Sequence, residues 1–98
     1  MTVVMTVDLP VTREDLEALS VAAGSVENPP EGLIVHTATE TAGGVRVVDI
    51  WESQAQFEKF RDDRLMASLQ KVAAERGLEV AGPPEPTFEQ VFDVVKGR

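Results

Sequence analysis

The sequence has 98 residues with a formal net charge of −8 at neutral pH, and it contains no cysteine and one histidine. A chain of this length forms one small domain, residues 1–98, around a single core. The negative charge repels phosphate groups, which argues against binding to nucleic acids or to anionic membranes. Disulfides, thiolate nucleophiles and zinc-ribbon sites are excluded, and with one histidine we expect no bound metal or other cofactor.

The N-terminal part of the chain predicts a strand, a helix and a loop. Residues 2–8 are short and β-branched, which is typical of a buried strand, and Pro10 ends it. This segment lacks the features of a targeting or membrane-spanning sequence, so we expect a cytoplasmic protein. Thr12 is placed to cap a helix that stops at Gly24, and the proline-rich residues 25–32 predict a loop.

The middle of the chain predicts a β-hairpin that leads into a second helix. Two β-rich segments, 33–40 and 45–52, are joined by a short link that contains two glycines. A capping box that begins at Ser53 starts the helix, which bends near Asp62-Asp63 and stops by Gly77. A connector ending in residues 82–86 then leads to a last strand, which we expect at 88–95.

The predicted order of elements is β-α-β-β-α-β. Right-handed crossovers place both helices on one face of a four-stranded antiparallel sheet, so the fold class is α+β, a ferredoxin-like sandwich. A sheet with one wet face alternates apolar and polar residues, but these strands carry apolar residues on both faces. We therefore expect a second copy of the chain to cover the open face, giving a homodimer through the sheet.

The parity of the hairpin link determines which side chains share a face. A four-residue link sets these residues opposite one another: Glu40 and Val45, His36 and Asp49, and Ile34 and Trp51. An odd link instead places His36 beside Arg46, Val48 and Ile50. A carboxylate that holds an imidazole in one tautomer is the arrangement of a general base, so His36 and Asp49 are catalytic candidates. The alternative is that the two residues only satisfy each other in a half-buried sheet, or that His36 faces solvent.

Four further residues of the helix and strand end are candidates for substrate binding. Trp51 either stacks on a planar ligand or anchors the sheet against the helix, and the anchor is favoured. Phe57 and Phe60 fit the core for the same reason. Arg64 falls between them around the helix, where a cation needs a partner: Asp49, a carboxylate of a second chain, or an anionic ligand. Alternatively, Arg64 extends along the edge of the apolar stripe toward water, the favoured interpretation.

The segment Asp49-Ile50-Trp51-Glu52-Ser53, followed by Phe57 on this topology, resembles the dimeric α+β barrel superfamily, especially small proteins related to antibiotic biosynthesis monooxygenases. The resemblance implies a cofactor-independent monooxygenase that acts on an aromatic or polyketide-like metabolite, in a pocket between sheet and helices. In that interpretation His36 is the base and Asp49 orients it, while Trp51, Phe57, Phe60 and Arg64 contact the substrate.

The sequence also departs from the family pattern. A histidine that the family often carries on the second helix is replaced by Phe60, and tyrosine is absent. The first strand lacks the asparagine of the haem-degrading branch, which argues against haem degradation. The competing interpretation is a non-catalytic ligand-binding or dimerisation domain.

Overall fold

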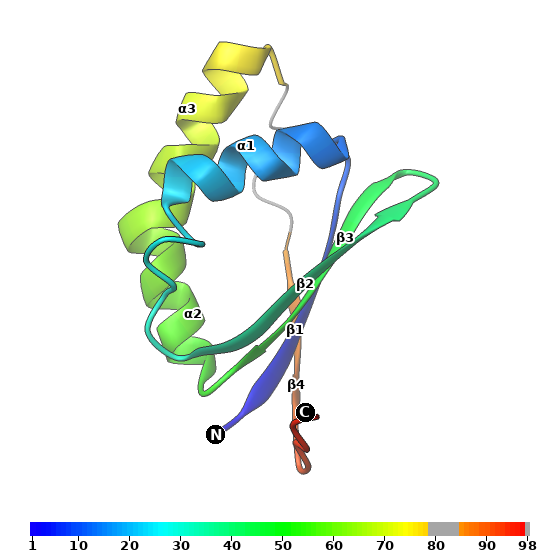
Figure 1. Cartoon of the computed structure of the whole chain (residues 1–98), viewed down its shortest axis with the longest axis vertical. Coiled ribbons are helices and arrows are strands. Elements are labelled where there is room, and N and C mark those ends of the chain that lie inside the picture. The colour runs from blue at the N-terminus through cyan, green and yellow to red at the C-terminus, as the bar shows by residue number, and fades with distance from the viewer. Residues whose placement is uncertain (79–84, 98) are drawn as a thin grey trace.

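The computed structural model describes residues 1–78 and 85–97. Its elements follow in this order: β1 (Val3–Leu9), α1 (Arg13–Ala23), β2 (Leu33–Thr41), β3 (Gly44–Trp51), α2 (Gln54–Phe60), the π-helical turn η1 (Arg61–Leu65), α3 (Met66–Arg76) and β4 (Thr87–Gln90). The strands form one antiparallel sheet in the order β2-β3-β1-β4. The helices lie on one side of this sheet (Figure 1), which confirms the predicted ferredoxin-like sandwich.

Both helices begin at the predicted caps. The Thr12 hydroxyl accepts the backbone N–H of Asp15 at 3.1 Å, and the Asp15 carboxylate accepts the N–H of Thr12 at the same distance. Gly24 ends α1 in the left-handed conformation, with φ of 67°. Ser53 accepts the N–H of Gln56 at 3.2 Å, but the Gln56 side chain bonds the Ser53 hydroxyl and not its backbone N–H. The second capping box is therefore only half formed.

The second helix changes its winding where a bend was predicted. The turn η1 separates α2 from α3 and contains Asp62 and Asp63. At the far end of α3, Arg76 donates to the buried Asp15 carboxylate at 2.5 Å, which joins the end of α3 to the start of α1. The guanidinium, and after it the N–H of Thr12, hold the pKa of Asp15 below its usual value.

The core lies between the helices and one face of the sheet. Its most buried members come from β1, β3 and α2: Val3, Met5, Val47, Trp51 and Phe57. Because successive strand residues point to opposite faces, every second residue of β1 and of β3 reaches this core. Asp49 lies between Val47 and Trp51 in that alternation and therefore points to the same side.

The opposite face of the sheet carries apolar residues as well, as predicted. Val4 of β1 pairs with Ile50 of β3, and both are only partly buried. Val48 is partly buried too, and Val35 of β2 is exposed. No helix of the described chain covers this face (Figure 1).

No helix of residues 1–78 or 85–97 is long and apolar enough to cross a membrane.

Two details of the strands differ from the prediction. Leu33, and not Ile34, pairs with Trp51, because a bulge between Leu33 and Val35 adds a residue to β2. The strand start is fixed by the Glu52 N–H, which donates to the Gly32 carbonyl at 2.7 Å.

The last strand is shorter than residues 88–95. It ends at Gln90, and the N–H of Val91 then donates to the carbonyl of Thr2, one residue before β1 begins. Beyond that bond the sheet offers no neighbouring strand, so the β-forming residues that follow remain outside it. Residues 82–84 of the predicted connector lie outside the described residues.

Gly44 at the start of β3 gives a test of the tight turn that joins β2 to β3. Its φ is 147°, and a Cβ added there would meet the Leu9 carbonyl oxygen at 2.1 Å. Gly44→Ala should therefore lower the melting temperature by roughly 10 °C or more, since backbone strain of this kind is worth about 1–3 kcal/mol. Gly43→Ala is the matched control, because nothing lies within 4 Å of its added Cβ. Equal melting temperatures for the two variants in thermal denaturation would contradict this description of the turn.

Candidate functional site

The candidate site is built on the β2–β3 pairing. His36 lies directly opposite Asp49, and its Nδ1 is 2.7 Å from the Asp49 Oδ1 atom. Both side chains are on the helix-covered side of the sheet, because Asp49 shares a face with Val47 and Trp51. The predicted pair therefore forms, and Glu40 also lies opposite Val45 as predicted.

A third side chain completes this pair. The Trp51 Nε1–H donates to Asp49 Oδ2 at 3.2 Å, so each carboxylate oxygen has its own partner. The side chain of Asp49 is 8% exposed and Trp51 is 1% exposed, whereas the His36 side chain is 46% exposed. The order Trp51, Asp49, His36 thus runs from the core to the surface at the edge of the sheet.

The carboxylate changes the proton affinity of the imidazole. Its hydrogen bond raises the pKa of His36 above the ordinary 6.5, while partial burial acts in the opposite direction. With Nδ1 engaged by Asp49, Nε2 is the ring nitrogen that remains, and the described residues provide it with no hydrogen bond. His36 therefore has the geometry of a base whose inner nitrogen is held and whose outer nitrogen can take a proton.

The structure brings the predicted aromatic residues together. The ring centroids of Trp51 and Phe57 are 5.5 Å apart in an edge-to-face arrangement, and those of Trp51 and Phe60 are 5.9 Å apart. Phe88 of β4, which the sequence analysis did not single out, lies 5.5 Å from Phe57. Trp51 and Phe57 are buried in the core, so in a single chain they act as the anchor between sheet and helix.

Arg64 has a partner that the sequence analysis did not consider. Its guanidinium donates to the backbone carbonyls of Ala23 and Asn28, at 3.1 and 2.9 Å, and lies 5.0 Å from the centre of the Phe60 ring. It forms no hydrogen bond with Asp49. Arg64 therefore closes the end of α1 and the following loop onto η1, a role that only the folded chain reveals.

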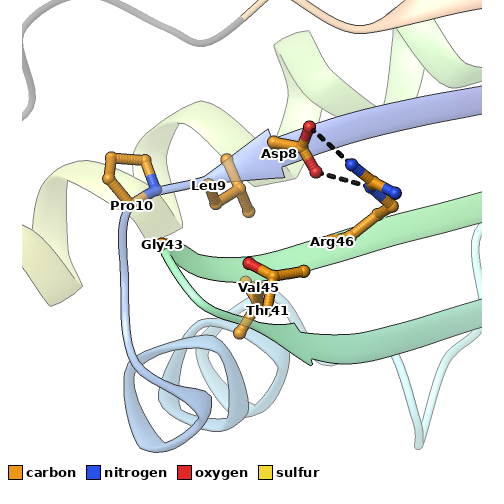
Figure 2. A pocket seen from close by; sticks show the side chains of 7 residues that line it. All are labelled: Asp8, Leu9, Pro10, Thr41, Gly43, Val45 and Arg46. Atoms are coloured by element: carbon orange, nitrogen blue, oxygen red, sulfur yellow. Dashed lines mark hydrogen bonds and ion pairs between the residues drawn. The ribbon is translucent and has the colours of Figure 1, made fainter.

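Two hollows lie away from these residues. One of about 320 Å³ is at the hairpin end of the sheet, where Arg46 donates twice to the Asp8 carboxylate (Figure 2). The other, about 470 Å³, lies between α1 and α3, with Val21 and Val72 among its lining residues. Neither hollow includes a residue of the His36–Asp49 pair. Within residues 1–78 and 85–97, no three His, Cys, Asp or Glu side chains gather to hold a metal ion.

Comparison with known proteins gives the fold its context. No protein-family model matches the chain. No curated protein matches it either. Solved structures do match over nearly the whole length. A protein from Chloroflexus aurantiacus J-10-fl, assigned to the antibiotic biosynthesis monooxygenases, has a TM-score of 0.62 and 13% identity, covering 98% of each chain.

Two further structures extend the comparison. NE2512 from Nitrosomonas europaea, a protein of unknown function, has a TM-score of 0.61 and 15% identity, covering 99% of this chain and 93% of its own. Rv0793 from Mycobacterium tuberculosis has a TM-score of 0.56 and 19% identity, covering 97% of each chain. At such identities the likeness concerns the fold. The chain has the fold of the antibiotic biosynthesis monooxygenase structures, as its strand order and Trp51 segment indicated.

The single imidazole gives a direct test of the pair. In NMR titration the His36 pKa should lie above 6.5, and Asp49→Asn should lower it, because the charged acceptor is lost. Since the folded-state pKa is raised, the pair stabilises the fold fully below pH 6.5, and this contribution disappears as pH rises through the folded-state pKa. Asp8→Asn is the control, because Asp8 bonds Arg46 on the other face. An unchanged His36 pKa in Asp49→Asn would show that the contact is absent in solution.

Proposed function

We propose that the chain is a cofactor-independent enzyme of the monooxygenase type, in which His36 takes a proton from a phenol or enol of an aromatic or polyketide-like metabolite. The observation that carries this proposal is the hydrogen-bonded series Trp51, Asp49, His36, which leads from the buried core to a half-exposed imidazole. The shared fold with structures assigned to antibiotic biosynthesis monooxygenases is consistent with it, as an analogy.

Each member of the series has a distinct role in proton transfer. His36 is the base, and its Nε2 receives the proton of the substrate. Asp49 fixes the imidazole through Nδ1 and stabilises the imidazolium that forms. Trp51 acts as a positioning residue, because its N–H occupies the second oxygen of Asp49 and keeps the carboxylate turned toward β2. Such a base is worth about 10²–10⁴ in rate.

The substrate supplies the electrons in this scheme. Removing its acidic proton raises the electron density of the ring, and the resulting anion reduces dioxygen without a metal. For a ring methylene the balance is CH₂ + O₂ → C=O + H₂O, so one oxygen atom enters the product and the other leaves as water. The proton held by His36 returns to the reduced oxygen, which regenerates the base.

In this proposal an apolar ring of the substrate meets the aromatic cluster that adjoins Trp51. Phe60 is partly buried and packs against the core cluster, and the Arg64 guanidinium lies over its ring. In the proposed complex, Phe57 and Phe60 form the apolar wall, with Arg64 at its rim and Trp51 behind the carboxylate. We assign no metal or organic cofactor to the reaction.

Oxygen consumption with anthrones and naphthols as probes tests the proposal. Where the wild-type chain turns over a probe, His36→Asn should reduce kcat/KM by about 10²–10⁴, because the base is lost. Asp49→Asn should lower the rate as well, since the amide cannot stabilise the imidazolium. Glu40→Gln, an exposed carboxylate change on the same strand and face, is the control. A His36→Asn variant with the wild-type rate would remove His36 from the mechanism.

A second candidate function is a non-catalytic binding domain whose open sheet face forms a homodimer. The observation that favours it is the apolar outer face, with Val4, Val48 and Ile50 only partly buried and no helix over them. Large exposed apolar patches mark protein interfaces in soluble proteins. The dimer is compatible with either candidate function, and a well-folded wild-type dimer that turns over none of the probes favours this second candidate.

The sheet-face dimer has its own test. Light scattering at micromolar concentration should give twice the mass of one chain. Ile50→Asp should shift the protein toward the monomer, because in the dimer it places a charge without a partner in the buried interface. Val21→Asp is the control, since Val21 is equally apolar but lies on α1 and is 81% exposed. A wild-type chain that stays monomeric would contradict the dimer.

A further inference from the structure

The helix layer carries a groove that the candidate site does not use. It is the hollow of about 470 Å³ between α1 and α3, two helices that are joined by the bond from Arg76 to Asp15. We call it the α1–α3 groove. Most of its lining side chains are exposed, so it opens to solvent. It is lined by five residues of α1 and three of α3: Glu14, Glu17, Ala18, Val21, Ala22, Lys71, Val72 and Glu75.

The lining residues of α1 form a stripe of their own. Positions 14, 17, 18, 21 and 22 have the spacing of one helix face. The core side of the same helix is different, because Leu16 packs against the core cluster and Ala23 is buried. At about 100° per residue the two sets lie on roughly opposite sides of α1. A surface helix usually carries charged and polar residues on the side opposite its core, whereas α1 has Ala18, Val21 and Ala22 there.

The apolar part of the groove has a floor and an uncovered wall. Val72 of α3 is 3% exposed, whereas Val21 of α1 is 81% exposed. A single exposed valine is common on protein surfaces, but this one stands beside a hollow and between two alanines. Because Ala18 and Ala22 are small, a large apolar side chain of a partner has room to pack against Val21.

The rim of the groove is mainly acidic. Three carboxylates and one ammonium group line it, which gives a formal charge of −2. Glu17 is bonded to Arg13 at 2.9 Å in an exposed pair. Within residues 1–78 and 85–97, Glu14 and Glu75 form no ion pair. These two carboxylates, one on each helix, are therefore available to cations of a partner.

Charge decides which occupant the groove favours. Each chain carries a net charge of −8, so a second copy is repelled at an acidic groove. Nucleic acids and anionic membranes are repelled for the same reason. A basic protein segment is attracted instead, and the acidic chain also accelerates its approach.

The shape of the groove favours a helical segment. The ridge of side chains on one helix packs into the groove between others, and an amphipathic helix places its apolar residues there. Helix α1 has 11 residues, which correspond to about three turns and roughly 16 Å. A partner helix of similar length covers the stripe from Glu14 to Ala22.

We propose that the α1–α3 groove binds a basic amphipathic helix of another protein. A large apolar side chain of that helix packs against Val21, and its lysines or arginines contact Glu14 and Glu75. Lys71 lies on the α3 side and disfavours a cation directly opposite, which selects one orientation of the helix. This interaction is separate from the reaction at His36, because the groove contains no residue of the His36–Asp49 pair.

A pair of model peptides tests the proposal. The probe is a fluorescently labelled helical peptide of about four turns, with leucines on one face and lysines beside them. Its control has glutamate in place of every lysine. Fluorescence anisotropy at physiological salt should show saturable binding of the lysine peptide, at least about tenfold tighter than the glutamate peptide. In NMR titration the shift changes of the protein should concentrate in α1 and α3. Absence of binding overturns the proposal.

Two valines provide a matched pair of variants. Val21→Lys should weaken binding of the lysine peptide by roughly tenfold or more, because it removes the apolar contact and adds a like charge. Val26→Lys makes the same charge change at a valine that is 82% exposed in the loop after α1. It should change the affinity little. Circular dichroism should show both variants folded, since both side chains are exposed.

Four glutamates provide a second matched pair. Glu14→Gln combined with Glu75→Gln should weaken binding of the lysine peptide about three- to tenfold, because two exposed ion pairs are lost. Glu27→Gln combined with Glu31→Gln removes the same amount of charge from exposed positions of the loop after α1. The loop variant should keep an affinity close to that of the wild-type chain.

The outcomes distinguish a specific groove from general attraction to an acidic chain. Equal losses within either matched pair would show general attraction and overturn the proposal. A lower particle mass for Val21→Lys than for the wild-type chain in light scattering would identify the groove as a contact between copies, and would also overturn it. Losses confined to the groove variants, with shift changes in α1 and α3, support the proposal.

Discussion

The arrangement of the candidate site depends on one buried carboxylate. Asp49 lies among core residues, where an ionised group without partners is strongly unfavourable. Its two oxygen atoms are satisfied by two different elements: His36 from the edge strand β2 and the indole of Trp51 within β3. The carboxylate therefore couples the position of the edge strand to the core, and displacement of either partner leaves a polar atom unpaired.

Helices of the described chain cover one face of the sheet and leave the other face uncovered. Helices α1, α2 and α3 cover the face that contains the core cluster, and their ends are fixed by specific bonds such as Asp15 to Arg76. The other face, the outer edge of β2 and the side chains of Phe92, Val94 and Val95 carry apolar surface that no helix or strand of residues 1–78 and 85–97 covers. Strand β2 is therefore important in both functional interpretations, because it carries His36 and is also an edge strand of the sheet.

Local patterns in the sequence predicted the topology and the His36–Asp49 pair well. The hairpin parity was correct although the link is tighter than four residues, because Thr41 and Gly44 pair with each other and each strand extends one residue further at the hairpin end. At its other end β3 stops at Trp51, one residue earlier than predicted. The bulge at Ile34 was missed because the backbone bond from Glu52 to Gly32 depends on tertiary contacts. The end of β4 was missed for a related reason: strand propensity does not reveal whether a neighbouring strand exists.

Some side-chain contacts could be predicted from the sequence, and others could not. Trp51 and Asp49 are two residues apart on one strand, so their shared face was predictable, although their hydrogen bond was not anticipated. Arg64 could not be placed from the sequence, because its acceptors are the backbone carbonyls of Ala23, at the end of α1, and of Asn28, in the loop that follows. Arg76 and Asp15 are 61 positions apart, and only the packing of α3 on α1 brings them together.

The π-helical turn η1 has a further consequence for how one helical segment serves two layers. A π turn accommodates one additional residue, which rotates everything after it by about 100° around the helix axis. As a result α2 directs Phe57 toward the sheet, while α3 directs its apolar side, including Val72, toward the neighbourhood of α1. A continuous α-helix would keep one phase throughout. The chain thus obtains two differently oriented apolar surfaces from a single uninterrupted helical run, without a loop between them.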